Sequence, residues 1–95
     1  MSNARVQSRI RVAQLMTLAA QLPPDPAGAW RGKALCRGLD PDLFYPVDVD
    51  DAAMPVRVCR RCPVRVACFR EREPWGIWGG TTEWERSAFS RAAVA

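Results

Sequence analysis

Four cysteines constrain this chain more than any other feature, because their spacing is uneven. Cys36 stands alone, and Cys59, Cys62 and Cys68 follow close together, so that the pattern reads C-x22-C-x2-C-x5-C. Three close thiols can surround one side of a compact metal centre while the distant fourth thiol closes the other side. Iron-sulfur clusters are commonly held by cysteine thiolates in sets of this kind. The spacing therefore favours a cubane iron-sulfur cluster.

Structural zinc and disulfide bonds are the two other uses of four cysteines. Zinc accepts four thiolates, but zinc ribbons and fingers generally present two closely spaced cysteine pairs, and only Cys59 and Cys62 form such a pair here. The chain has no histidine, which excludes mixed cysteine and histidine zinc sites and every histidine-based catalytic scheme. Disulfide bonds persist only in oxidising surroundings. We rank the cluster first, zinc second and disulfide bonds third.

The N-terminal segment indicates a cytoplasmic protein that does not engage a membrane. Arg5, Arg9 and Arg11 are spread through it, whereas a secretory signal places its positive charge ahead of an uninterrupted apolar stretch. Thr17 and Gln21 interrupt the apolar run, which is too short to span a bilayer. In the cytoplasm, four cysteines in 95 residues are expected to hold metal or to do redox work.

Charge is unevenly distributed in this small chain, which carries a formal net charge of +4. Residues 40–51 contain five aspartates and no basic residue, while residues 57–72 contain six arginines and one glutamate. The basic stretch overlaps the three close cysteines. Such a surface can meet nucleic acid or an acidic partner, and it can equally be an ordinary solvated face.

Hydrophobic periodicity predicts an all-α fold. Residues 4–22 carry apolar side chains at three- and four-residue steps, which is typical of an amphipathic helix, and the prolines that follow end it. Residues 30–51 show no sustained period, and we expect only a short helical turn at residues 34–37. A helix capped by Asp50 or Asp51 runs through Val58, and Pro63 begins another that extends toward Glu73.

Glycines and a capping motif organise the C-terminal third of the chain. Residues 76–80 read Gly-Ile-Trp-Gly-Gly, a turn whose glycines permit backbone angles that other residues avoid. Thr82 and Glu85 form a capping box that begins a final helix of about ten residues. We therefore predict a small few-helix domain around a four-cysteine cluster at residues 30–95, and a separate amphipathic helix with its proline-rich linker at residues 1–29.

Taken together, these features resemble the WhiB-like family of iron-sulfur transcription regulators from actinobacteria and their phages. The resemblance covers residues 30–89, about 60 of the 95. The matching elements are Trp30 and Cys36, the run Asp40-Pro41-Asp42-Leu43-Phe44-Tyr45-Pro46, the motif Cys59-x2-Cys62-Pro63-Val64-x3-Cys68, and Gly76-Ile77-Trp78-Gly79-Gly80 followed by Thr82, Glu85 and Arg86. Four such elements in order at matching separations are specific.

The resemblance implies a [4Fe-4S] cluster held by Cys36, Cys59, Cys62 and Cys68. It also implies binding to the C-terminal region 4 of the principal sigma factor of RNA polymerase, with a response to oxygen or nitric oxide at the cluster. The partner-binding positions that it implies are Trp30, Phe44, Tyr45, Gly76, Trp78, Gly79 and Gly80. For each aromatic residue alone, core packing is at least as good an interpretation as a partner contact.

The chain departs from the family pattern in features that shape the functional hypothesis. Only seven residues separate Cys68 from Gly76, so the third helix is short, and residues 81–95 carry two arginines against two glutamates where the family has a basic DNA-binding tail. A neutral tail adds little affinity for phosphates. The hypothesis is a regulator, not an enzyme and without a small-molecule substrate, that binds sigma and modulates or blocks promoter use. If DNA is touched, the contact is weak and falls to Arg57, Arg60, Arg61 and Arg65.

Two alternatives from other classes stay open at this point. The first is a four-cysteine zinc module that binds nucleic acid without sigma. The second is a thiol-disulfide oxidoreductase in the cluster-free form, in which Cys59 and Cys62 do the chemistry and nearby arginines lower the thiol pKa. The oxidoreductase leaves Cys36 and Cys68 without a role.

Overall fold

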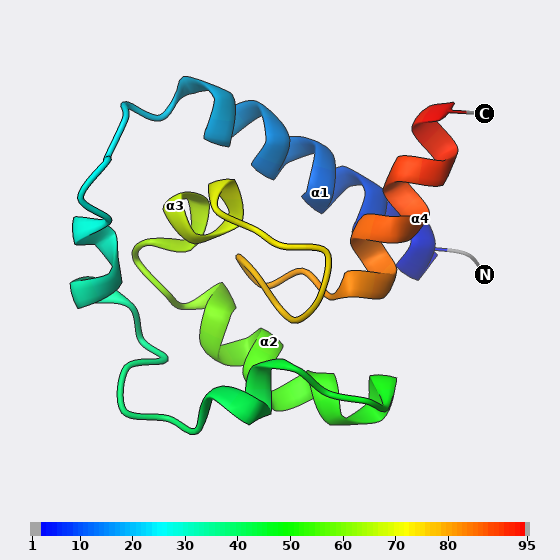
Figure 1. Cartoon of the computed structure of the whole chain (residues 1–95). Helices are drawn as coiled ribbons and strands as arrows, with labels where there is room; N and C mark the ends of the chain where they lie inside the picture. The colour runs from blue at the N-terminus through cyan, green and yellow to red at the C-terminus, as the bar shows by residue number, and fades with distance from the viewer. Residues whose placement is uncertain (1–2, 95) are drawn as a thin grey trace.

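In the computed structural model, which describes residues 3–94 and the side chains of residues 6–92, every named element is a helix (Figure 1). The α-helices are α1 (Asn3–Gln21), α2 (Ala53–Arg60), α3 (Arg65–Arg70) and α4 (Glu83–Val94). Three 3-10 helices, η1 (Ala29–Lys33), η2 (Pro41–Phe44) and η3 (Val49–Ala52), lie between α1 and α2. The only β-type pairing in the described part of the chain is an isolated bridge between Trp78 and Thr81. The predicted all-α class is confirmed.

The N-terminal helix α1 packs on the rest of the domain through one narrow face. Val12 and Leu15 are almost fully buried and contact Phe69 of α3, while Ala19 and Phe89 pack against the edge of this cluster. α1 therefore lies against both α3 and α4, across the end of the domain opposite α2 (Figure 1). Division of the chain after residue 29 stays a prediction.

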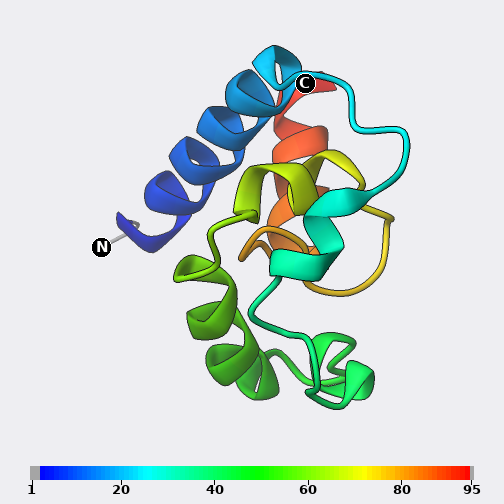
Figure 2. The same ribbon diagram turned by 90° about the vertical axis from the view of Figure 1, so that its left-hand side faces the viewer.

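The segment between α1 and α2 is more ordered than the sequence indicated. Asp40 and Asp48 each accept a hydrogen bond from the backbone amide two residues later, at 3.0 and 2.9 Å, and so begin η2 and η3. Short polar side chains favour such local caps because they compete for backbone donors. The predicted turn is present at residues 35–38, but the 3-10 helices were not predicted. η1 lies beside α3 (Figure 2).

The first and last residues of helices α2 and α3 differ from those predicted from the sequence. α2 begins at Ala53, so that Pro55 lies in its first turn, where the missing amide donor costs no helical hydrogen bond. Pro63 does not start α3. Residues 63 and 64 form a turn, α3 begins at Arg65, and it ends at Arg70 well before Glu73.

The capping box at the start of α4 is confirmed. The Thr82 hydroxyl accepts a hydrogen bond from the Glu85 amide at 3.1 Å, and Glu85 accepts one from the Thr82 amide at 3.0 Å. Such reciprocal bonds satisfy two amides that otherwise lack a partner at a helix start.

Among the described helices, residues 3–94, none combines the length and the apolar composition that a membrane span requires.

Two hydrophobic clusters hold the domain, one on each side of the glycine turn. The first joins Phe44, Ala52, Cys59 and Ile77, with Val56 and Val58 at its edge. The second is the cluster of Val12, Leu15 and Phe69 beneath α1. Cys59 of α2 is therefore part of the first cluster, Cys68 of α3 directly precedes Phe69 of the second, and the glycine turn contributes Ile77 to the first.

Candidate metal centre

All four cysteines line one cavity with a volume of about 350 Å³. Its other walls come from η1, η2, α2, α3 and the glycine turn. Since a water molecule takes about 30 Å³ of liquid volume, this hollow is much larger than a single ion requires. The sequence placed the four cysteines together, and the structure brings all four to the same cavity.

Local structure sets the position of each thiol around this cavity. Cys36 lies in the turn after η1 and is exposed, whereas Cys59 lies in the last turn of α2 and is buried. Cys62 follows α2 and donates its amide to the Cys59 carbonyl at 3.1 Å, so the two thiols lie one helical turn apart. Cys68 projects from the middle of α3, and its amide bonds to the Val64 carbonyl at 2.9 Å.

The donor set is purely thiol. All four cysteines are free, and among the described residues no three or more histidine, cysteine, aspartate or glutamate side chains lie close enough together to hold a single metal ion. Thiolates are the usual ligands of iron-sulfur clusters. The four thiols and the size of the cavity between them fit a polynuclear iron-sulfur group.

Burial controls the protonation of the two deeper thiols. It raises the pKa of Cys59 to about 11 from an ordinary 9.0, against a hydrogen bond from the Gly80 backbone that acts to lower it. Burial likewise raises the pKa of Cys68, with the Gly79 backbone opposing. The expectation that nearby arginines would make Cys59 a reactive thiolate is therefore wrong, because desolvation dominates. Binding of a metal to these thiols would release protons.

The glycine turn forms one wall of the cavity through Ile77, Trp78 and Gly79. Gly76, Gly79 and Gly80 have positive φ angles of 81, 59 and 77°, as the predicted turn requires. A Cβ on Gly76 would lie 2.6 Å from the Tyr45 ring, so the absence of a side chain lets the ring pack on the backbone. Arg65 donates from Nε to the Gly79 carbonyl at 2.7 Å and ties the turn to α3.

The four aromatic residues singled out from the sequence all line the cavity, but they differ in exposure. Trp30 and Phe44 are each 9% exposed, and Phe44 belongs to the first hydrophobic cluster. Trp78 is half-buried, while Tyr45 is 46% exposed. Tyr45 and Trp78 are therefore the two aromatics of the rim that another molecule could contact without disrupting the core.

The four arginines predicted to contact DNA also differ in exposure. Arg57, Arg60 and Arg61 are exposed on α2 and at its end. Arg65 is half-buried, lines the cavity, and is engaged by the Gly79 carbonyl. Arg65 therefore holds the glycine turn in place beside the cavity and is not available to DNA in the same way as the three exposed arginines.

Sequence reasoning missed the structural role of Arg86. This residue is 8% exposed, and its guanidinium donates to the carbonyls of Thr81 and Gly76, both at 2.7 Å. It also contacts the Glu73 carbonyl at 3.2 Å. Arginine suits this place because its planar fork presents several donors at fixed angles. The signals in the sequence were its position four residues after the capping threonine and its place in the resemblance to the WhiB-like family.

Comparison with known proteins shows a family match over the part of the chain that contains the four cysteines. The family model described as transcription factor WhiB matches residues 30–89. Transcriptional regulator WhiB1 of Bifidobacterium longum is 42% identical over 74 residues, which cover 68% of this chain and 80% of that protein. WhiB2 of Mycobacterium tuberculosis is 34% identical over 77 residues, covering 77% and 86%. WhiD of Streptomyces coelicolor is 46% identical over 68 residues, covering 60% and 61%.

Proposed function

Since the chain belongs to the WhiB family of transcription factors, it is a transcriptional regulator and not an enzyme, and we propose that it acts as an iron-sulfur protein that binds the principal sigma factor. In this proposal Cys36, Cys59, Cys62 and Cys68 hold a [4Fe-4S] cluster. The rim of the same cavity contacts region 4 of sigma, and the complex modulates or blocks promoter use.

The observation that carries the proposal is the convergence of the four cysteines on one cavity whose rim is aromatic. When bound, the cluster would supply a redox-active centre that oxygen or nitric oxide can attack. Trp30 and Phe44 shield this space from water, because they are buried against it. Exclusion of solvent and hydrogen bonding near the sulfurs are the means by which a protein adjusts such a centre.

A contact surface for sigma is supported by the exposed apolar side chains that precede α2. Leu35, Leu39, Leu43, Tyr45 and Val47 are each more than a third exposed, and Leu39 and Tyr45 also line the cavity. A gathering of exposed apolar residues beside an aromatic rim is typical of a protein interface. Loss of the cluster would alter this surface, because Cys36 lies within the same segment.

The test is complex formation between anaerobically purified holoprotein and sigma region 4, followed by size-exclusion chromatography. We expect a stable complex that carries the absorption of the cluster. Replacement of any one of the four cysteines by alanine should remove both the absorption and the complex. A thiol-disulfide oxidoreductase would instead depend chiefly on Cys59 and Cys62, and a zinc module would be colourless. Holoprotein that forms no complex with sigma would overturn the partner assignment.

A further inference from the structure

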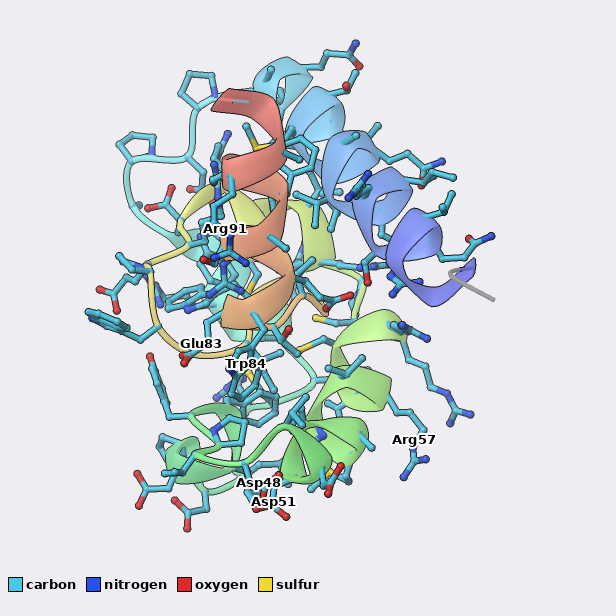
Figure 3. The ribbon with its side chains drawn as sticks, turned by 90° about the vertical axis from the view of Figure 1, so that its right-hand side faces the viewer. Asp48, Asp51, Arg57, Glu83, Trp84 and Arg91 are labelled. Atoms are coloured by element: carbon cyan, nitrogen blue, oxygen red, sulfur yellow. The ribbon has the colours of Figure 1, made fainter. Side chains whose placement is uncertain are left out.

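Three arginines lie on the outer side of α2 and directly after its end, and the same helix carries Cys59. Arg57, Arg60 and Arg61 are exposed and lie three and four residues apart, so they share one side of the helix. Cys59 faces the cavity and is buried. Figure 3 shows Arg57 pointing away from the domain, whereas Asp48 and Asp51 lie at the lower end of the domain in this view. Asp48 and Asp51 therefore do not lie beside the Arg57 side chain.

These three guanidinium groups have no acidic partner in the described chain. The two ion pairs among residues 3–94 are Arg11 with Glu85 and Arg70 with Glu71, and neither involves α2. Like charges at three- and four-residue spacing destabilise a helix. An anionic molecule on this face would remove that repulsion, so the arrangement is suited to a negatively charged partner.

The basic region extends beyond α2 toward the glycine turn and α1. The side chains of Arg60 and Arg65 both lie beside Gly80, at about the distance of van der Waals contact from a Cβ placed there. Burial lowers the pKa of Arg65, and repulsion from Arg60 and Arg11 lowers it further. Arg65 donates a hydrogen bond to the Gly79 carbonyl, and Arg11 forms an ion pair with Glu85. Arg65, whose partner is a neutral carbonyl, adds positive potential behind the three free arginines, whereas the charge of Arg11 is balanced by Glu85.

The C-terminal helix cannot provide an equivalent surface. Its two arginines are balanced by Glu83 and Glu85. Arg86 is buried among backbone carbonyls, and Arg91 donates to the Ser87 hydroxyl at 2.7 Å. The free basic side chains of residues 53–94 are therefore concentrated on the outer side of α2.

We infer that the outer face of α2 binds the phosphate backbone of duplex DNA through Arg57, Arg60 and Arg61. This inference extends the proposed function, since it takes the protein to be a regulator that works at promoters. Phosphate contacts require charge and donors, which Arg57, Arg60 and Arg61 supply, while the exposed Leu39 and Tyr45 line the cavity. Because α2 turns its cysteine inward and its arginines outward, DNA on this face leaves the rim open to sigma.

The test measures binding of anaerobic holoprotein to a short fluorescein-labelled duplex of mixed sequence by anisotropy, over salt concentrations from about 50 to 200 mM. The variant R57Q/R60Q/R61Q removes three charges from the face. The matched control R9Q/K33Q/R91Q removes three charges from exposed positions elsewhere. We expect the α2 variant to bind at least about tenfold more weakly and to lower the slope of log affinity against log salt by about three, while the control stays within about twofold to threefold of the parent.

Each other result would overturn the assignment. Equal weakening in the two triple variants would mean that net charge alone governs binding, and no weakening in either would mean that α2 is not the contact. Tighter binding to single-stranded RNA of the same length than to the duplex would identify RNA, and not duplex DNA, as the partner. If R57Q/R60Q/R61Q loses sigma binding but keeps the DNA affinity of the parent, the outer face of α2 is a protein interface.

Two additional measurements keep the outcome interpretable. Cluster absorption and the sigma complex are recorded on the same samples, so a failure of the proposed function is seen separately from a failure at α2. Circular dichroism reports whether the variants fold. If the triple variant does not fold, the single variants R57Q, R60Q and R61Q should each lower the salt slope by about one. R57K/R60K/R61K retains the charges and should restore most of the affinity.

Discussion

Phe69 lies against Gly79 so closely that a Cβ on the glycine would come within 2.7 Å of the Phe69 Cβ. Phe69 follows Cys68 in α3 and is completely buried, and on its other side it contacts Val12 and Leu15 of α1. This one contact therefore links the N-terminal helix, a cysteine-bearing helix and the glycine turn. The position of the turn over the cavity depends on it.

Replacement of Gly79 by alanine should destabilise the domain and expel the cluster. The new methyl group would meet Phe69 and the Arg65 carbonyl, and the φ angle of 59° is strained for any residue with a side chain. We expect a loss of about 3 kcal/mol in the free energy of unfolding, measured by anaerobic denaturation followed by circular dichroism, while visible absorption before denaturation reports loss of the cluster. G38A is the control, because Gly38 has φ 83° but open space around it. Equal losses in the two variants would show that the Phe69 contact is unimportant.

Arg86→Lys should be severely destabilising although it retains the charge. A lysine ammonium cannot reach the carbonyls of Thr81 and Gly76 with the same geometry, so buried acceptors would lose their donors. The expected loss is about 3 kcal/mol in the free energy of unfolding by urea denaturation. R91K, at an exposed position of the same helix, should change it by less than about 0.5 kcal/mol. A stable R86K protein would refute the bracing role of Arg86.

Glu85 should make the stability of the domain sensitive to acid. Burial acts to raise its pKa, but hydrogen bonds from Ser8, the Thr82 amide and Arg11 outweigh it, so the folded-state pKa lies below the ordinary 4.5. A lowered folded pKa means that the carboxylate stabilises the fold above pH 4.5, and this contribution is lost as the pH falls through the folded pKa. The difference in unfolding free energy between parent and E85Q should therefore shrink on acidification.

Urea denaturation of parent and E85Q at a series of pH values measures this difference, and acid lability common to both proteins cancels. E71Q is the control, because Glu71 is exposed in a longer ion pair with Arg70, at 3.7 Å. Exposed pairs contribute little, so E71Q should show almost no pH-dependent difference. A parent-to-E85Q difference that is constant with pH, or grows toward acid, contradicts the assignment.

Tyr45→Ala should weaken the complex with sigma without releasing the cluster. The Tyr45 ring is 46% exposed at the cavity rim and packs on Gly76. Truncation of an aromatic anchor at an interface commonly costs about 2 kcal/mol or more, which is roughly a thirtyfold loss of affinity. Trp75 is 67% exposed but does not line the cavity, so W75A is the matched control and should bind normally. Affinity that falls with W75A and not with Y45A would move the interface away from the rim.

Local motifs were readable from the sequence because each depends on neighbouring residues. The Thr82 and Glu85 capping box and the positive φ angles of the glycine turn were predicted correctly. The uneven spacing of the cysteines also predicted that they would share one site, and all four line the same cavity. Their role as cluster ligands stays a prediction.

Features that depend on tertiary contacts could not be read in the same way. Arg86 looks like a surface charge in the sequence, and only the folded turn surrounds it with carbonyls. Met16 shares the apolar stripe of Leu15 but is 40% exposed, because the contact with α3 is narrower than the stripe. Adjacent residues of a non-helical segment point in different directions, so the sequence predicted that one of Phe44 and Tyr45 would be buried and the other would face outward. Only the fold shows that Phe44, at 9% exposed, is the buried one and Tyr45, at 46%, the outer one.

The most direct test of the account is the iron and acid-labile sulfide content of the full chain purified without oxygen. If the four cysteines hold the proposed cluster, the protein is brown and contains iron and sulfide in equal amounts, at the content of one [4Fe-4S] cluster per chain. Each cysteine-to-alanine variant then loses both. A colourless protein that is folded by circular dichroism and contains no iron would contradict the central claim.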